Sequence, residues 1–371
     1  MVGSDYEIMI AGGGPAGVST WLHLQKFNPA LAARTILIEK SIYPREKLCG
    51  GGVTPRADLI LGRLGIKIDV PSVPIHNLEF RLEADNINWN EGNAFRVVRR
   101  HEFDHELIKV AIDRGLKVKE GETFSNFERI DRKLLIKTSR GEYRIKVLVG
   151  ADGTNSTVRK KMGIAENPRV SRLISILTPV DPRSTSEFIN NKAVLDFGPV
   201  TEGLQGYVWD FPCLEKGVPM MNQGIFDSRV HPDHPKASLK TIFSRELQAR
   251  NAYRESGTWN AFPIRWFSNE GIFSRQNIIL VGDAAGVDPI FGEGISQSIE
   301  YGDVAAASIV NALDNNDLSF KGYKTRLLNH PLGHSLTINM HFAKKIYQGG
   351  PTALKRIHNI LTSRQQPTKD I

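Results

Sequence analysis

The chain has 371 residues, of which 40% are hydrophobic and 24% are charged. This size and composition are typical of a soluble globular protein of about two domains. No segment approaches the ~18 consecutive apolar residues of a membrane-spanning helix, so an integral membrane protein is excluded. Lys and Arg number 48 against 40 Asp and Glu, a formal net charge of +8. The charge suits anionic ligands or an acidic membrane surface without selecting between them, and the scattered basic residues match no nucleic-acid motif, so we expect no nucleic-acid partner.

Cysteine and histidine patterns indicate neither a disulfide framework nor a metal site. Cys49 and Cys213 are too few for a disulfide scaffold and lack zinc-ligand spacing. The run His101–His105 has the His-Glu-x-x-His spacing of zinc proteases, but no third ligand is evident, so we expect no metal. No charged or apolar export segment precedes the first predicted strand, and we therefore expect a cytoplasmic protein.

A strand, a glycine-rich turn and a helix follow one another at the start of the chain. Residues 6–11 predict a strand, and residues 18–27 carry apolar side chains at helical spacing. A second strand at 35–38 ends on Glu39, which completes a βαβ unit. In such a unit an acidic residue at this position accepts the hydroxyls of an adenosine ribose.

The glycines between the first strand and the helix have separate expected roles. Gly12 permits the tight turn, Gly14 lets the backbone approach a pyrophosphate, and Gly17 lets the helix pack on the strand. The helix N-terminus then attracts the phosphates. Together these residues predict a dinucleotide site.

The rest of the chain predicts a second, sheet-containing domain inserted into the first. Residues 67–93 are polar and irregular, with a strand at 78–82, and suggest an excursion from the nucleotide domain. The other expected elements are a helix at 102–113, strands at 134–138 and 144–149, short strands over 172–267 with a helix at 238–246, a buried strand at 277–281, a helix rich in small residues at 294–313, and helices between 320 and 360.

Two further motifs lie far from the first glycine turn. Asp152-Gly153 follows one predicted strand, and Gly282-Asp283 follows another, ahead of Gly292 and Gly294-Ile295. In order and spacing these motifs resemble the glutathione-reductase-type FAD fold of the single-component flavoprotein hydroxylases and the geranylgeranyl reductases. The resemblance covers most of the chain, from Tyr6 to about Tyr347.

The resemblance implies positions for the cofactor. Asp283 would hold the ribityl hydroxyls, and Arg100 would reach the FAD side of the crevice. The backbone of Gly294 and Ile295 would face the flavin pyrimidine, where helix N-terminal amides stabilise the negative charge of reduced flavin. The implied cofactor-binding residues are Gly12, Gly14, Pro15, Ala16, Gly17, Glu39, Lys40, Arg45, Cys49, Gly50, Gly51, Arg100, Asp152, Gly153, Gly282, Asp283, Pro289, Gly292, Gly294 and Ile295.

Two segments resemble geranylgeranyl reductases in particular. Residues 43–52 are similar to their Lys-x-Cys-Gly-Gly segment, which implies that Cys49 lies beside the isoalloxazine ring. There a thiol tunes the flavin or relays a proton, although a small buried hydrophobic role is an open alternative.

The second such segment, residues 206–212, resembles the aromatic-x-Trp-x-Phe-Pro motif. Tyr207 and Trp209 share one face of the predicted strand, either lining an apolar pocket or forming ordinary core. Asp210 and Cys213 depart from the reductase pattern, which puts the substrate in doubt. Cys49, Tyr207 and Trp209 are the candidate catalytic residues.

The resemblance leaves several chemistries open. The Gly-Ile of Gly294-Ile295 favours the reductases over aromatic hydroxylases, and halogenation is disfavoured because no Lys occurs over 68–108. Only one glycine-rich dinucleotide motif is present, so the sequence offers no second binding domain for a nicotinamide cofactor. We therefore expect NADPH or NADH to bind transiently as the reductant. We expect reduction of a C=C bond in a small apolar, isoprenoid-like substrate, with an FAD-dependent monooxygenase and a non-catalytic flavin-binding protein as alternatives. Peripheral membrane contact stays open, and no protein partner is implied.

The predicted fold is α/β: a Rossmann-like, glutathione-reductase-type FAD-binding domain with an inserted mixed β-sheet substrate domain and a C-terminal helical tail. The expected boundaries are 1–75, 96–171 and 268–315 for the FAD-binding domain, 76–95 and 172–267 for the substrate domain, and 316–371 for the helical tail.

Overall fold

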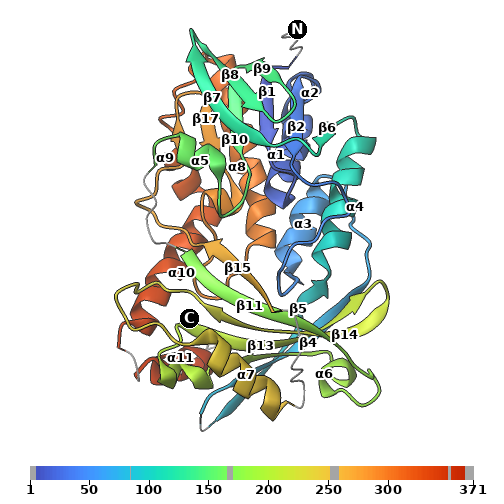
Figure 1. Ribbon diagram of the computed structural model, residues 1–371, viewed down its shortest axis with the longest axis vertical. Coiled ribbons are helices and arrows are strands. Elements are labelled where there is room, and N and C mark those ends of the chain that lie inside the picture. The colour runs from blue at the N-terminus through green and yellow to red at the C-terminus, as the bar shows by residue number, and fades with distance from the viewer. Residues whose placement is uncertain (1–5, 84, 165–169, 251–258, 350–351, 364–371) are drawn as a thin grey trace, which may run out of the picture.

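The computed structural model describes residues 6–83, 85–164, 170–250, 259–349 and 352–363. Figure 1 shows two layered halves: a sheet flanked by helices in the upper half and a larger sheet across the lower half. This is the α/β architecture that the sequence predicts.

The upper half is built on a six-stranded sheet whose central strands are parallel. Every residue of the first strand and of the strands beside it is buried, because both faces of the sheet are covered. Helices pack on one face, and a smaller antiparallel sheet over residues 124–145 packs on the other. The strand order is β16 (Ser274–Arg275), β17 (Ile278–Leu280), β10 (Val147–Gly150), β1 (Ile8–Ala11), β2 (Thr35–Glu39) and β6 (Lys117–Glu120), with β16 alone antiparallel.

Two long helices pack side by side against this sheet: α1 (Pro15–Phe27) and α8 (Ile295–Asp314). Their close approach depends on a glycine, since a Cβ at Gly302 would lie 2.4 Å from the Ser19 hydroxyl oxygen. Ser19 also donates a 2.6 Å hydrogen bond to the carbonyl of Ile299. The small residues that the sequence predicts at 294–313 therefore allow α8 to pack closely against α1.

Shorter elements complete the upper half. The strand expected at 144–149 is in fact two strands in different sheets, because the chain passes from an antiparallel hairpin into the buried sheet. The elements are α2 (Pro29–Ala33), α3 (Pro55–Arg63), α4 (Arg100–Asp113), α5 (Thr157–Lys161), the 3-10 turn η2 (Gly282–Ala284) and a three-stranded sheet of β7 (Phe124–Ile130), β8 (Lys133–Thr138) and β9 (Glu142–Ile145).

The lower half is an eight-stranded mixed sheet. Its order is β15 (Asn260–Arg265), β11 (Val170–Pro179), β14 (Val218–Asp227), β13 (Gly206–Glu215), β12 (Lys192–Asp196), β4 (Ser72–Arg81), β5 (Asn86–Val98) and β3 (Gly52–Val53). The segment read as polar and irregular is thus a long hairpin of β4 and β5. The hairpin extends beyond the expected excursion 76–95 at both ends. The sequence did not show these limits, because the outward-facing residues of the hairpin are polar and its strands pair with strands that are distant in the sequence.

Helices cover the outer side and one edge of the large sheet. In Figure 1 α7 lies below the sheet, and α10 and α11 lie at its left. The tail is helical, as expected, and a new helix begins at Pro331. Residues 350 and 351 lie outside the described ranges. These elements are α6 (Ser186–Ile189), the 3-10 helix η1 (Gly198–Glu202), α7 (Leu239–Ala249), α9 (Tyr323–Asn329), α10 (Pro331–Tyr347) and α11 (Ala353–Ser363).

Candidate active site

A cavity of about 1290 Å³ lies between the two halves, and we call it the central cavity. It is lined at one end by the carboxyl ends of β1 and β2, which is where ligands bind in open parallel sheets. Its other end is lined by the large sheet and by α10 and α11. Pockets for single small ligands are typically ~300–1,000 Å³, so the cavity has room for more than one such molecule.

The glycine turn at the nucleotide end has the geometry that the sequence predicts. Gly12 has a φ of +111°, and a Cβ there would lie 2.3 Å from the carbonyl oxygen of Ala151. Gly14 starts α1, and no side chain caps the helix at that position. Gly14, Pro15 and Ala16 line the cavity, so the uncapped helix N-terminus is available to an anion.

Glu39 lies beside this turn with its carboxylate fixed by the backbone. It accepts hydrogen bonds from the amides of Gly13, at 2.8 Å, and Ser41, at 3.0 Å. The neighbouring Lys40 also lines the cavity. The acidic residue at the end of the second strand is therefore held at the cavity border, in the place expected for a ribose contact.

The two arginines expected at the cofactor share one carboxylate. Arg100 forms a bidentate pair with Asp104, with two distances of 2.8 Å, and Arg45 lies 3.2 Å from the same side chain. Burial acts to lower the pKa of Arg100, but the charge of Asp104 outweighs it and raises that pKa. Both guanidinium groups line the cavity as fixed cations.

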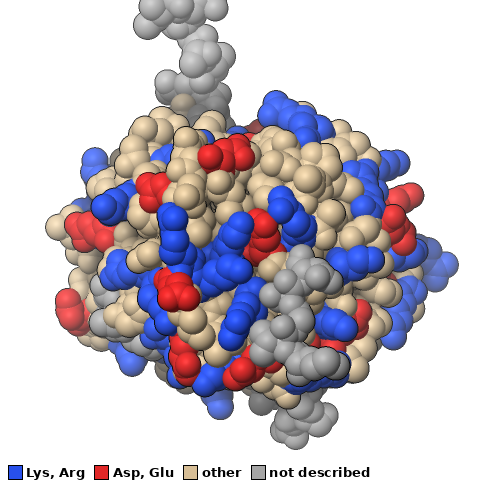
Figure 2. Space-filling view, turned by 90° about the horizontal axis from the view of Figure 1, so that it is seen from above, with Lys and Arg blue, Asp and Glu red and all other residues tan. Residues whose placement is uncertain are grey.

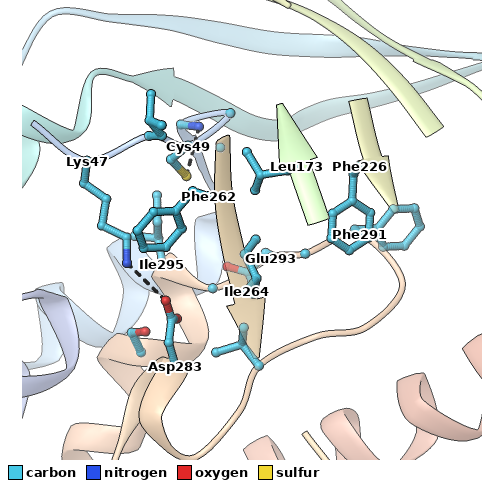
Figure 3. A pocket seen from close by; sticks show the side chains of 18 of the residues that line it. Lys47, Cys49, Leu173, Phe226, Phe262, Ile264, Asp283, Phe291, Glu293 and Ile295 are labelled. Carbon is cyan, nitrogen blue, oxygen red and sulfur yellow. Dashed lines mark hydrogen bonds and ion pairs between the residues drawn. The ribbon is translucent and has the colours of Figure 1, made fainter. Parts of the chain in front are cut away.

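Asp283 has a partner that the sequence analysis did not assign. Lys47 Nζ lies 3.1 Å from Asp283 Oδ2, and the same ammonium group lies 4.8 Å from the ring centre of Phe262 (Figure 3). Lys47 comes from the loop after β2 and Asp283 from the turn before α8. The sequence feature that could have identified Lys47 as a site residue is its position in the Lys-x-Cys-Gly-Gly segment.

The N-terminus of α8 borders the middle of the cavity. Gly294 starts this helix without a side-chain cap of its own, and Gly292, Gly294 and Ile295 line the cavity. Glu293, which the sequence analysis missed, also faces the cavity (Figure 3) and accepts a 2.9 Å hydrogen bond from the amide of Ser296. Burial raises the pKa of Glu293 to about 7. A carboxyl group between two glycines ahead of a helix was the only sequence signal.

Asp152 and Gly153 line the cavity, and the aspartate also has a structural role. Asp152 Oδ2 accepts a 3.0 Å hydrogen bond from the amide of Val158 and so stabilises the start of α5. Burial raises the pKa of this carboxyl group.

The loop that carries Cys49 is held against the large sheet. Asn222 donates a 2.8 Å hydrogen bond to the carbonyl of Cys49, and the thiol sulfur lies 3.4 Å from the amide of Gly51. Gly51 has a φ of +85°, and a Cβ there would lie 2.1 Å from the carbonyl oxygen of Val98. Cys49, Gly50 and Gly51 all line the cavity, as expected.

The aromatic residues of β13 form one wall of the cavity. Tyr207, Trp209 and Phe211 all line it, so the pocket interpretation of this strand holds. The Tyr207 hydroxyl donates to the carbonyl of Phe291 at 2.5 Å, and Trp209 Nε1 donates to Asn222 at 3.3 Å. Because both polar atoms are engaged by protein, these two candidate catalytic residues contribute shape to the cavity.

The two departures from the reductase pattern fall outside the cavity lining. Asp210 points to the other side of the sheet and pairs with Arg250 at 2.8 Å, and Cys213 is fully buried. Neither departure therefore contributes a side chain to the cavity wall.

Three predicted cofactor residues do not line the cavity. A Cβ at Gly17 would lie 2.0 Å from the carbonyl oxygen of Gly12, so Gly17 serves helix packing. Gly282 packs on Ala16, where an added Cβ would lie 2.7 Å away, and Pro289 lies in the turn that Asp288 holds by accepting from the amide of Ile290. The sequence motifs include these positions because they shape the backbone around the site.

The His101–His105 pattern does not form a zinc site. His101 lies 3.3 Å from Glu215, whereas His105 stacks on Tyr43. Across the described ranges, no cluster of three or more His, Cys, Asp or Glu side chains is arranged to hold a metal ion.

The groups that line this end of the cavity fit a dinucleotide whose pyrophosphate binds at one helix N-terminus and whose ring system places negative charge at another. Two helix N-termini, at Gly14 and Gly294, border one cavity, with Glu39 near the first and Asp283 near the second. The first has no side-chain cap, and at the second Glu293 accepts from the amide of Ser296. This arrangement defines an FAD-binding flavoprotein of the Rossmann-like class. A profile of the FAD binding domain family matches residues 5–306, and the chain belongs to this family.

Several relatives have names that describe reductases. The chain is 28% identical to a menaquinone reductase of Mycolicibacterium smegmatis over 324 residues, covering 81% of this chain and 75% of the relative. It is 26% identical to a digeranylgeranylglycerophospholipid reductase of Thermoplasma volcanium over 342 residues, covering 85% of this chain and 80% of the relative.

A solved structure shares the fold, and another relative has a name that describes different chemistry. The crystal structure of a geranylgeranyl bacteriochlorophyll reductase-like protein from Thermoplasma acidophilum aligns with a TM-score of 0.78 at 22% identity, covering 96% of this chain and 91% of that chain. A 1H-pyrrole-2-carbonyl-[peptidyl-carrier protein] chlorinase of Pseudomonas fluorescens is 24% identical over 361 residues, covering 85% of this chain and 78% of the relative. The protein is therefore an FAD-dependent oxidoreductase by family, and its substrate requires a separate argument.

Proposed function

We propose that this protein is an FAD-dependent reductase that uses NADPH or NADH to saturate a C=C bond in an apolar, isoprenoid-like substrate. The observation that carries the proposal is the continuity of the central cavity. One end has the fixed charges and helix N-termini that suit a dinucleotide, and the other end is lined by aromatic and aliphatic side chains.

The residues at the nucleotide end would bind and orient FAD. The N-terminus of α1 would attract the pyrophosphate, and Glu39 would accept ribose hydroxyls. Asp283 would hold the ribityl chain, and the N-terminus of α8 would stabilise negative charge on the ring system. When bound, the flavin supplies hydride-transfer chemistry.

The residues at the other end suit a substrate without polar groups. Trp209, Phe211 and Phe226 line the cavity together with Leu173 and Ile264. Figure 3 shows several of these apolar side chains converging on the space beside Cys49 and Glu293. An apolar chain held there would exclude water from the reacting carbon atoms.

Two groups in the middle of the cavity can hold or move a proton. Cys49 places its thiol at the cavity wall, and Glu293 places a carboxyl group beside the start of α8. Reduction of a C=C bond requires one hydride and one proton. A carboxyl group whose pKa burial raises to about 7 suits the proton-donating step at neutral pH.

Anaerobic turnover tests the proposal. Purified protein reconstituted with FAD and reduced by NADPH or NADH is incubated with prenylated and aromatic compounds, and the products are analysed by mass. A gain of two hydrogens without O₂ supports the reductase. A gain of one oxygen that requires O₂ indicates a monooxygenase, and flavin reduction with neither product indicates a non-catalytic flavin-binding protein; either result contradicts the proposal.

A further inference from the structure

The positive charge of the chain is concentrated at its C-terminal end. Residues 318–369 contain nine Lys and Arg residues and no Asp or Glu, while the whole chain has a formal net charge of +8. The remainder of the chain is therefore close to neutral. The helices after α8 therefore belong to a region of net positive charge, although the basic residues within it are scattered.

The opposite end of the molecule has a different charge pattern. Figure 2 shows the face at the top of Figure 1, where Lys and Arg side chains gather near the middle with Asp and Glu side chains among them. In this half of the protein Glu7 pairs with both Arg34, at 2.7 Å, and Lys146, at 3.2 Å. Basic residues there are partly neutralised by neighbouring carboxylates.

Large apolar side chains are exposed where the cationic region meets the central cavity. Ile338 and Phe342, one helical turn apart on α10, are 53% and 46% exposed, and Phe291 in the loop before α8 is 43% exposed. All three also line the cavity. An exposed apolar group at the mouth of an apolar cavity marks an interaction or entry site.

Basic and apolar side chains share the outer face of α10. The exposed positions His334, Ile338, His341, Phe342 and Lys345 follow helical spacing, so they lie along one side of the helix. The opposite side packs into the protein core through residues that include Leu336, Met340 and Ala343. The outer face therefore combines two large apolar side chains with Lys345 and two imidazoles.

α11 extends the same wall of the cavity. Arg356 donates a 2.6 Å hydrogen bond to the carbonyl of Lys345, which ties the start of α11 to the end of α10. Ile357 and Leu361 line the cavity from this helix, while Lys355 is exposed. The two helices thus have an apolar inner side, and their exposed side includes Lys345 on α10 and Lys355 on α11.

We propose that the outer face of α10, together with Phe291, docks on an anionic lipid bilayer and that apolar substrate enters the central cavity from the membrane between these residues. Ile338 and Phe342 would enter the interfacial region of the bilayer, and Lys344 and Lys345 would contact lipid phosphates. No helix among the described residues is long and apolar enough to cross a bilayer, so the contact is peripheral. The proposal rests on the proposed function only for the apolar nature of the substrate.

Vesicle co-sedimentation of the full-length, FAD-loaded protein tests the docking surface. We expect binding to vesicles of phosphatidylglycerol and phosphatidylcholine in equal parts, weaker binding as salt is added, and little binding to phosphatidylcholine alone. The variant Ile338→Gln/Phe342→Gln is expected to reduce binding about tenfold or more. Leu59→Gln is the matched control, because Leu59 is 56% exposed on α3 and does not line the cavity.

A second pair of variants separates local charge from net charge. Lys344→Gln/Lys345→Gln and Lys117→Gln/Lys133→Gln remove two exposed cations each. Only the first pair is expected to weaken vesicle binding, by about tenfold. Equal losses in the two pairs, or equal binding to neutral and anionic vesicles, would overturn the proposal.

Two further readouts keep the outcomes distinct. Light scattering measures oligomeric state, and a dimer that the Ile338→Gln/Phe342→Gln substitutions convert to a monomer would assign this face to a second copy of the chain and overturn docking on lipid. Bound flavin in each variant checks folding. Vesicle binding is measured without turnover, so a protein that binds anionic vesicles but reduces no C=C bond retains the docking surface and loses the proposed function.

Discussion

Lys47 Nζ lies 3.1 Å from Asp283 Oδ2, across 236 residues of sequence and at the centre of the cofactor end of the cavity. Thr154 approaches the same oxygen at 3.4 Å. The lysine and threonine thus occupy one carboxylate oxygen, which leaves Oδ1 toward the start of α8, 3.6 Å from the Cβ that Gly294 lacks. The free oxygen is the one available to a ligand hydroxyl.

Replacement of Asp283 should therefore weaken flavin binding more than replacement of Lys47. Asp283→Ala removes the ligand contact and leaves the ammonium group unpaired, and we expect about tenfold to a hundredfold weaker FAD binding, in line with hydrogen bonds to charged groups. Lys47→Met should have an effect of about threefold or less, because Oδ1 stays in place. Titration of apoprotein with FAD, followed by flavin fluorescence, measures both, and a larger loss in Lys47→Met would contradict this assignment.

Gly12→Ala should destabilise the protein through a backbone clash. The added Cβ would lie 2.3 Å from the carbonyl oxygen of Ala151, at a φ of +111°. Gly163→Ala is the control, since Gly163 also has a positive φ, +69°, but no atom lies within 4 Å of its added Cβ. We expect about 1 kcal/mol of destabilisation for the control and about 3 kcal/mol or more for Gly12→Ala in urea unfolding. Equal costs would mean that the clash is relieved by local movement.

Glu293 should make the stability of the protein depend on pH. Burial raises its pKa from 4.5 to about 7, so the folded state binds this proton more tightly than the unfolded state. The stabilising contribution is therefore complete below about pH 4.5 and is lost as the pH rises through about 7.

In Glu293→Gln this part of the pH dependence should be absent, while the amide oxygen can still accept from Ser296. We expect the free energy of unfolding of the variant, relative to wild type, to rise by about 1–2 kcal/mol between pH 5 and pH 8. Urea unfolding at both values measures the difference. A constant difference between the two proteins would show that Glu293 titrates as an ordinary carboxyl group.

Tyr207→Phe should affect stability more than catalysis. The hydroxyl is engaged with the carbonyl of Phe291 at 2.5 Å, so its loss leaves a carbonyl group without this donor. We expect about 1–2 kcal/mol of destabilisation and a decrease in kcat of less than about threefold. A loss of activity of a hundredfold or more at unchanged flavin content would instead assign proton donation to Tyr207.

Local sequence patterns predicted the nucleotide end of the site well. The glycine turn, the helix that follows it and the position of Glu39 depend on residues within one βαβ unit, where steric and helix-end effects dominate. The Lys47–Asp283 pair and the position of Glu293 depend on how distant segments meet, and no local pattern encodes that. Only one strand of the β4–β5 hairpin was predicted, at 78–82, and its full length was not. The reason is similar, because the hairpin pairs with β12 and β3, which are distant in the sequence.

The C-terminal helices show the same limit in another form. Helical spacing predicted α10 and α11, but the sequence did not indicate that their apolar sides would line the ligand cavity. Ile338 and Phe342 are apolar yet exposed. Which apolar residues of a helix are buried and which are exposed depends on the elements packed around it, so the sequence alone does not show it. The residue-level domain boundaries and the ligand contacts of the site residues stay predictions.

The contact of Gly302 with Ser19 fixes how far apart the starts of α1 and α8 lie. Both helix starts line the central cavity. A ligand that contacts the start of α1 and the start of α8 together therefore meets them at a separation set by the packing of the two helices.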